Sequence, residues 1–253
     1  VAAWMVILYH LTLFGMYDLN SNLGFLAEFI VHSGYLAVDL FFILSGFIIA
    51  YNYHDHFERV DVRKWVQFLI NRLARIYPVH IFAMLLMIYP VLSGLEAIWS
   101  EVSGKPLFIV KNLLLIHAWR VPSDTWYHGP SWSLSCEWLA YLTFPMLMVV
   151  FNRIKNKWLL WTLIPMMILP VAIHIITGVY KLHASAGVLI VLPEFAAGVA
   201  LFQIFRLSPD RRREVWWSGI IISTALLMFY FSLHSHLIGI WAFWLTPLYT
   251  VVI

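Results

Sequence analysis

Residues 131–151 read SWSLSCEWLAYLTFPMLMVVF, an apolar stretch long enough to cross a bilayer that contains one ionisable side chain, Glu137. Placing a carboxyl group in hydrocarbon is costly, so intramembrane acids face a bundle interior or a water-filled cavity and have a partner. Ser133 and Tyr141 lie four residues before and after Glu137, on the same face of the predicted helix. Such a stripe can also consist only of polar contacts between helices. Because such contacts seldom need a carboxylate, we predict a functional interior face.

The composition of the whole chain extends this prediction. Of the 253 residues, 62% are hydrophobic and only 11% are charged, whereas soluble domains carry about a quarter charged residues. The apolar segments have the length of membrane helices and lack the alternation of outer-membrane strands. We therefore predict an all-α fold, a single polytopic transmembrane bundle over residues 1–253. About eight crossings are expected, at roughly 1–16, 33–53, 76–93, 131–151, 158–177, 186–205, 215–233 and 237–253, with an interfacial or re-entrant helix at 106–119.

The distribution of basic residues predicts the orientation. Twelve of the 16 Lys and Arg residues lie in the connections 54–75, 152–157 and 206–213. By the positive-inside rule, these connections and the N-terminus are cytoplasmic. Both ends of the chain lie inside apolar segments, so we expect a domain truncated at both ends.

Three further titratable residues fall within predicted spans. His10 would lie about 15 Å deep, near mid-membrane, although a lone buried histidine is more often bonded to a backbone carbonyl. For Asp39 we expect a supporting role, through a hydrogen bond to backbone or to His10. Glu194 follows Pro193 and is expected to cap a helix N-terminus.

Two other features concern binding chemistry. Arg72 and Arg75 project from one helical face just before the predicted span 76–93, and paired guanidinium groups suit phosphate oxygens. The alternative is ordinary topology or binding of lipid headgroups. The only cysteine, Cys136, excludes an internal disulfide and a multi-cysteine metal site, and we interpret it as a packing residue. No metal site is expected.

Four segments in this order resemble one family: VILYH at 6–10, GYLAVDLFFILSGFII at 34–49, NRLARIYPVHIF at 71–82 and GPSWSLSCEWLAYLTFPML at 129–147. They are similar to the bacterial membrane-bound acyltransferase-3 family, which includes O-antigen and other glycan O-acetyltransferases. The resemblance implies an enzyme of the bacterial inner membrane that moves an acyl group, usually acetyl, from cytoplasmic acyl-CoA to a hydroxyl group. The acceptor would be an envelope glycan, as in polysaccharide modification, or a lipid-linked or other hydroxyl compound. Membrane lipids are the other expected partners. No nucleic-acid partner is expected.

The resemblance also implies roles for residues. Its helix-one histidine corresponds to His10, its acyl-CoA arginine pair to Arg72 and Arg75, and its glutamate to Glu137. Our hypothesis makes His10 the general base, reached through a long narrow cavity. Glu137 either orients the imidazolium or positions the acceptor hydroxyl. Transfer can be direct or proceed through an acetylated His10.

Two alternatives come from other classes of protein. A proton-coupled transporter or flippase could use His10 and Glu137 as a relay, because intramembrane acids and histidines also mark ion pathways. Residues 1–125 and 126–253 show no internal repeat of the kind found in many transporters, which favours the enzyme. A sensing scaffold that has lost activity is disfavoured because all four family residues are present.

Overall fold

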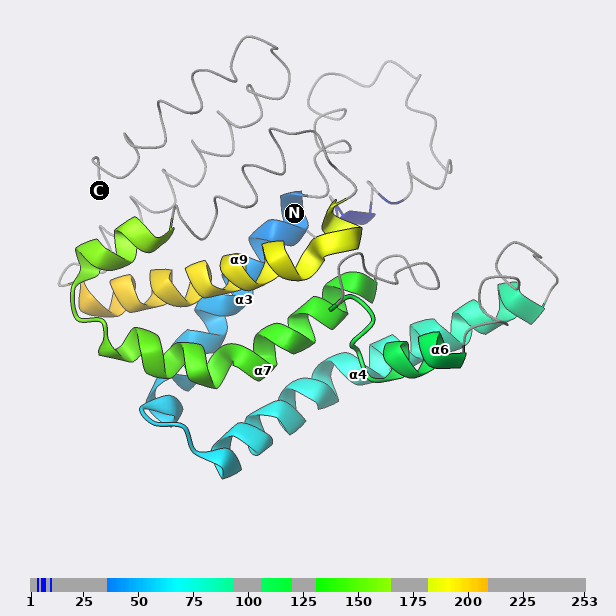
Figure 1. Cartoon of the computed structure of the whole chain (residues 1–253), viewed down its shortest axis with the longest axis horizontal. Helices are drawn as coiled ribbons and strands as arrows, with labels where there is room; N and C mark the ends of the chain where they lie inside the picture. The colour runs from blue at the N-terminus through cyan, green and yellow to red at the C-terminus, as the bar shows by residue number, and fades with distance from the viewer. Residues whose placement is uncertain are drawn as a thin grey trace, which may run out of the picture.

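The computed structural model describes residues 36–92, 106–119, 131–164 and 182–208, together with Trp4, Val6, Ile7 and His10. Every regular element in these residues is a helix, which confirms the all-α fold class for this part of the chain (Figure 1). The elements are α3 (Leu36–Tyr53), the short 3-10 helix η1 (His54–Phe57), α4 (Val62–Leu92), α6 (Pro106–Leu113), α7 (Trp132–Arg153) and α9 (Leu182–Leu207).

Four of these helical segments are long and apolar enough to cross a membrane: Ala37–Phe57, Val62–Leu86, Trp132–Arg153 and Gly187–Leu207. They correspond to the predicted spans 33–53, 76–93, 131–151 and 186–205. The predicted spans 1–16, 158–177, 215–233 and 237–253 lie wholly or largely outside the described residues. The total of eight crossings and the cytoplasmic N-terminus therefore stay predictions.

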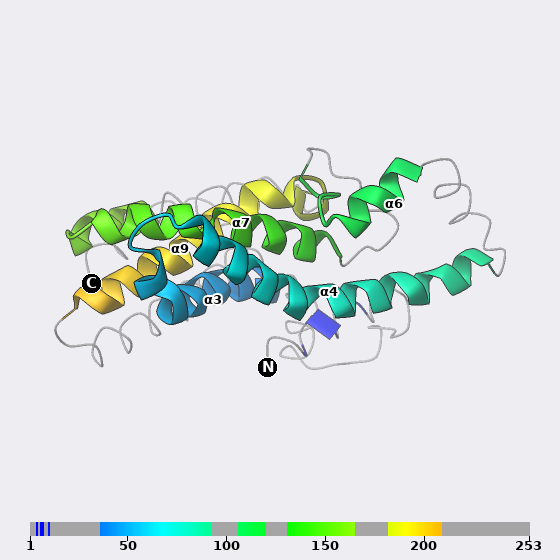
Figure 2. The same cartoon turned by 90° about the horizontal axis from the view of Figure 1, so that it is seen from below.

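Helix α4 differs from its prediction. It is one continuous helix of 31 residues that begins at Val62, where the Asp61 carboxylate accepts hydrogen bonds from the backbone N–H groups of Arg63 and Lys64. The predicted span began only at residue 76, because Arg72 and Arg75 lower the local hydropathy. Both arginines instead lie in the middle of the helix, where long side chains can carry their charge away from apolar surroundings. Figure 2 shows α4 running past α3 along the underside of the molecule.

Helices α3 and α9 pack most closely, because glycine replaces a side chain on each. A Cβ atom at Gly46 would overlap the backbone carbonyl of Phe195, and one at Gly198 would overlap that of Ile43. Small residues allow membrane helices to approach in this way. Phe47 packs edge-on against Phe202 further along both helices, so α3 and α9 run parallel.

A cluster of buried aromatic rings joins η1, α4, α7 and α9. Phe57 of η1, Phe68 of α4, Phe144 of α7 and Phe195 of α9 are all at most 2% exposed. Ring pairs such as Phe57 with Phe144, centroids 5.7 Å apart, meet nearly edge to face, which suits the aromatic quadrupole. This core fixes where η1 and α4 lie relative to α7, and so fixes the wall of the site described next.

The predicted short helix at 106–119 is helical only over α6. Leu115 has a φ of 57°, and the Ile116 N–H donates to the Lys111 carbonyl, so the chain ends the helix in a left-handed turn. Ser135 of α7 holds this turn: its hydroxyl donates to the Leu115 carbonyl at 2.8 Å and accepts from the Ala118 N–H at 3.1 Å. Ser135 of the 131–151 stretch therefore has a structural role.

Candidate active site

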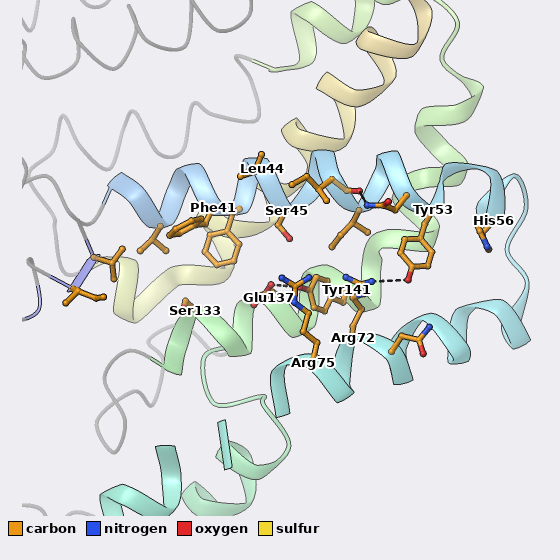
Figure 3. Close-up of a pocket in the computed structure, with 18 residues that line it drawn as sticks. Phe41, Leu44, Ser45, Tyr53, His56, Arg72, Arg75, Ser133, Glu137 and Tyr141 are labelled. Carbon is orange, nitrogen blue, oxygen red and sulfur yellow. Dashed lines mark hydrogen bonds between the residues drawn. The ribbon is translucent and has the colours of Figure 1, made fainter. Parts of the chain in front are cut away.

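A cavity of about 1100 Å³ lies between α3, α4 and α7 (Figure 3). Its α3 wall extends from Val38 to Tyr53, which corresponds to about 22 Å along the helix. The end near Val38 is apolar, and the end near Tyr53 is polar. The lining residues are Val6, Ile7, Val38, Phe41, Phe42, Leu44, Ser45, Ile48, Ile49, Asn52, Tyr53, His56, Asn71, Arg72, Arg75, Ser133, Glu137 and Tyr141.

Five residues singled out in the sequence line this one cavity: Arg72, Arg75, Ser133, Glu137 and Tyr141. The arginines come from α4 and the other three from α7, so two polar faces predicted separately meet across the cavity (Figure 3). The arginines were expected at the cytoplasmic edge and the carboxyl group in the interior. Because α4 begins earlier than predicted, the arginines and the carboxyl group share one chamber.

The partners of Glu137 are now visible. The Tyr141 hydroxyl, one turn further along α7, donates a hydrogen bond to its carboxylate. The positive charges of Arg75 and Arg72 act on the same carboxylate. Ser45 of α3 also hydrogen-bonds to Tyr141. The carboxyl group therefore has a hydrogen-bond donor and two positive charges near it, which are the kinds of partner that a buried acid needs.

Arg72 is held more firmly than Arg75. Its Nη2 donates to the Tyr53 hydroxyl at 2.9 Å, and its guanidinium lies over the rings of Tyr53 and Phe68. Its Nε is buried with no acceptor among the described residues. A buried donor without an acceptor is unfavourable. Because Nε and a neighbouring Nη can donate side by side to one oxyanion, this edge of the Arg72 guanidinium suits a ligand such as a phosphate group.

His10 lies one helical turn beyond Val6, which lines the apolar end of the cavity, but His10 is not among the described lining residues. Its Nδ1 lies 2.8 Å from the Val6 carbonyl oxygen. Because a carbonyl can only accept, Nδ1 carries the proton, and Nε2 is the proton-accepting nitrogen of the neutral ring. The backbone bond expected of a lone histidine is thus present, and the pairing of His10 with Glu137 stays a prediction.

Asp39 lies on the α9 side of α3, outside the cavity lining. Its carboxyl group hydrogen-bonds to that of Glu194, and the two residues are 8% and 1% exposed. The interpretation of Glu194 as a helix cap is wrong, because α9 begins at Leu182 and continues through Pro193. The sequence prediction took the proline as a helix start, whereas membrane helices tolerate proline within their length.

Cys136 lies at the position predicted for it, in a packing cluster. It is 1% exposed and packs with Phe42, Ala118 and Val191. The sequence analysis missed five polar residues that line the cavity: Ser45, Asn52, Tyr53, His56 and Asn71. The helical repeat Val38, Phe41, Ser45, Ile48, Asn52 could have identified the α3 face, because these positions recur every three or four residues.

Comparison with known proteins identifies the family. The sequence matches the acyltransferase domain family over residues 1–253. It is 28% identical to acyltransferase MdmB of Streptomyces mycarofaciens over 219 residues, which are 77% of this chain and 51% of MdmB. It is 30% identical to peptidoglycan O-acetyltransferase OatA of Listeria monocytogenes over 139 residues, which are 50% of this chain and 22% of OatA.

A shorter match, 41% identical over 81 residues, is to protein 2 in the picA locus of Rhizobium radiobacter, and covers 27% of this chain and 42% of that protein. No solved structure matches the chain. The aligned region spans about half the length of MdmB and less than a quarter of OatA. Because the family match extends over the full sequence, the chain belongs to the acyltransferase-3 family and is an acyltransferase domain.

Proposed function

We propose that this domain is the membrane part of an O-acyltransferase that moves an acyl group, most simply acetyl, from acyl-CoA to a hydroxyl of a cell-envelope glycan or related acceptor. The observation that carries the proposal is the meeting of Arg72 and Arg75 with Glu137 and Tyr141 in one cavity. A phosphate-binding pair and a hydrogen-bonded carboxylate beside an apolar channel suit a substrate that has a charged end and a long neutral arm.

The cavity supports a particular direction for the donor. Acyl-CoA carries its phosphates at the nucleotide end, which would lie at the polar mouth beside Arg72 and Arg75. The α3 wall of the cavity is about 22 Å long, and the neutral pantetheine arm would follow part of it toward Phe41. The thioester would then lie at the apolar end, near the helix that carries His10.

In the proposed reaction, Nε2 of His10 takes the proton of the acceptor hydroxyl as its oxygen attacks the thioester carbonyl carbon. The new carbon–oxygen ester bond forms, the carbon–sulfur bond breaks, and the CoA thiolate leaves and takes up the proton. An imidazole whose Nδ1 is fixed by a carbonyl presents Nε2 in a defined orientation. Glu137 would hold Arg75 and Tyr141 in place, so that the donor and acceptor are oriented for attack.

The acceptor is the least constrained substrate. OatA is named for O-acetylation of peptidoglycan, and this supports a glycan hydroxyl here as well. We propose that the acceptor is presented at the outer face of the bacterial inner membrane, opposite the basic connections and the cytoplasmic N-terminus. The family assignment disfavours the proton-coupled transporter.

The test is transfer of labelled acetyl from acetyl-CoA in membranes of cells that express the complete gene. Four expression-matched proteins are compared: the native protein, His10→Ala, the double variant Arg72→Ala/Arg75→Ala, and Arg153→Ala. Arg153 is an exposed basic residue at the end of α7, outside the cavity, and serves as the control.

Loss of a general base should lower the rate by about 10² to 10⁴. The double arginine variant should raise the KM for acetyl-CoA, while the control keeps native activity. Equal labelling in all four proteins, or none in the native protein, would contradict the proposed function.

A further inference from the structure

Tyr53, the last residue of α3, lies at the polar end of the cavity and contacts Arg72 (Figure 3). Its hydroxyl accepts a hydrogen bond of 2.9 Å from Arg72. Its ring centroid lies 5.2 Å from Cζ of the same guanidinium and 5.1 Å from the ring of Phe68, at an interplanar angle of 76°. One aromatic side chain therefore contacts the guanidinium both through its ring and through its hydroxyl.

These contacts restrict Arg72 strongly. Phe68, which is 2% exposed, provides a second ring with its centroid 5.6 Å from Cζ. Aromatic faces attract a guanidinium and fix the position of its plane, while the hydrogen bond to Tyr53 fixes its rotation within that plane. The remaining donors, including the buried Nε, then have a fixed direction.

Arg75 provides the contrast. It lines the same cavity one turn further along α4, but its side chain is exposed. Within the described residues, no aromatic ring or hydrogen-bond acceptor holds its guanidinium, and its charge acts on Glu137. The two arginines are therefore not equivalent: Arg72 is held by two aromatic rings and a hydrogen bond, whereas Arg75 interacts with Glu137 through its charge.

We propose that Tyr53 is a positioning residue that holds the Arg72 guanidinium ready for a phosphate group of the acyl-CoA donor. An unrestrained arginine loses rotamer freedom when it binds, and fixing it beforehand removes that cost from the binding step. Tyr53 acts through Arg72 and needs no contact with the reacting atoms. This inference rests on the proposed function, because it assigns a role within the proposed donor site.

The experiment compares two donors and five variants in the complete protein: Tyr53→Phe, Tyr53→Leu, Tyr51→Phe, Arg72→Ala and the double variant Arg72→Ala/Tyr53→Phe. Tyr53→Phe keeps the ring and loses the hydroxyl, and Tyr53→Leu loses both. Tyr51→Phe is the matched control, because Tyr51 lies two residues earlier on α3, is 57% exposed and lies outside the cavity lining. The donors are acetyl-CoA and S-acetyl-pantetheine, which has the same thioester but no phosphate. The protein is measured in a neutral detergent without anionic lipid, so that the phosphates of the donor are the only phosphate groups that can bind Arg72.

With acetyl-CoA, Tyr53→Phe should raise KM about tenfold while kcat stays unchanged, and Tyr53→Leu should raise KM further. With S-acetyl-pantetheine, the KM of Tyr53→Phe should equal that of the native protein. In the background of Arg72→Ala, Tyr53→Phe should not change the KM for acetyl-CoA further, because Tyr53 acts only through the Arg72 guanidinium, which is already absent. Tyr51→Phe should match the native protein with both donors.

Two results would overturn the inference. The first is an unchanged KM for acetyl-CoA in Tyr53→Phe together with a raised KM in Arg72→Ala. In that case the proposed donor site would stand, and the role of Tyr53 would not. The second is an equal effect of Tyr53→Phe on both donors, which would indicate a purely structural role. If Arg72→Ala itself leaves the KM for acetyl-CoA unchanged, the donor site of the proposed function fails, and the inference fails with it.

Discussion

The Tyr141 hydroxyl donates a hydrogen bond to the Glu137 carboxylate one turn earlier on α7, and both side chains face the cavity that contains the arginine pair. A carboxylate in the apolar interior thus has a partner on its own helix as well as opposite charges across the cavity. Its position is fixed by α7, whereas the arginines that it attracts come from α4. Glu137 therefore couples the two walls of the proposed donor site.

The first prediction concerns this hydrogen bond. Tyr141→Phe should lower the acyl transfer rate about tenfold, because the Glu137 carboxylate loses its donor. Glu137→Gln should have a larger effect, roughly 10²-fold. The double variant should be no slower than Glu137→Gln alone, since the two groups act as a unit. Initial rates with labelled acetyl-CoA measure all three.

Tyr77→Phe is the control for that series, because the Tyr77 hydroxyl donates to the Leu113 carbonyl outside the cavity. It should retain the native rate. Full additivity of the Glu137 and Tyr141 effects would show that the hydrogen bond has no catalytic role.

A second prediction separates the two arginines. Arg72→Lys should raise the KM for acetyl-CoA about tenfold, because an ammonium group cannot keep the planar contacts with Tyr53 and Phe68 while presenting two donors to a phosphate. Arg75→Lys should raise it only about twofold to threefold, because a positive charge without fixed geometry is retained there. Equal effects of the two substitutions on KM would argue against different roles.

The third prediction concerns the packing of α3 on α9. Gly46→Ala should destabilise the protein by about 1–3 kcal/mol, because the new methyl group meets the backbone carbonyl of Phe195, which cannot rotate away. Gly187→Ala is the matched substitution on α9, where the methyl group meets side-chain atoms of Trp132 and Cys136. Thermal unfolding of the purified protein should show the larger loss for Gly46→Ala, and the reverse order would refute close backbone contact at that position.

A fourth prediction addresses the buried acids Asp39 and Glu194. Two ionised carboxylates in contact would repel each other, so the contact is favourable when one proton lies between them. Glu194→Gln keeps a donor for Asp39 and should unfold within a few degrees of the native protein. Glu194→Leu removes the donor and should cost about 2 kcal/mol of stability. Identical melting temperatures of the Gln and Leu variants would show that the hydrogen bond contributes nothing.

Local spacing explains which parts of the site could be predicted from the sequence. Ser133, Glu137 and Tyr141 share a face of α7 because every fourth residue of a helix does, and Arg72 and Arg75 share a face of α4 for the same reason. The sequence could therefore place each group on one face of its helix, with the serine, glutamate and tyrosine in the interior and the arginine pair at the cytoplasmic edge. The family resemblance then assigned both faces to one reaction.

Contacts between distant residues explain what was missed. The hydrogen bond from Arg72 to Tyr53 depends on the turn of η1, which brings the end of α3 back against α4. The contact of Asp39 with Glu194 joins two helices that only the folded chain brings together. Arg72 and Arg75 were placed on a helical face just before the predicted span 76–93, whereas the segment of α4 that is long and apolar enough to cross a membrane is Val62–Leu86 and includes both arginines.

The most direct test is a cryo-EM structure of the complete protein with bound CoA. We predict phosphate density within hydrogen-bond distance of the Arg72 and Arg75 guanidinium groups, and pantetheine density that follows α3 from Tyr53 toward Phe41. CoA bound at another surface, with the cavity between α3, α4 and α7 unoccupied by the ligand, would contradict the proposed donor site.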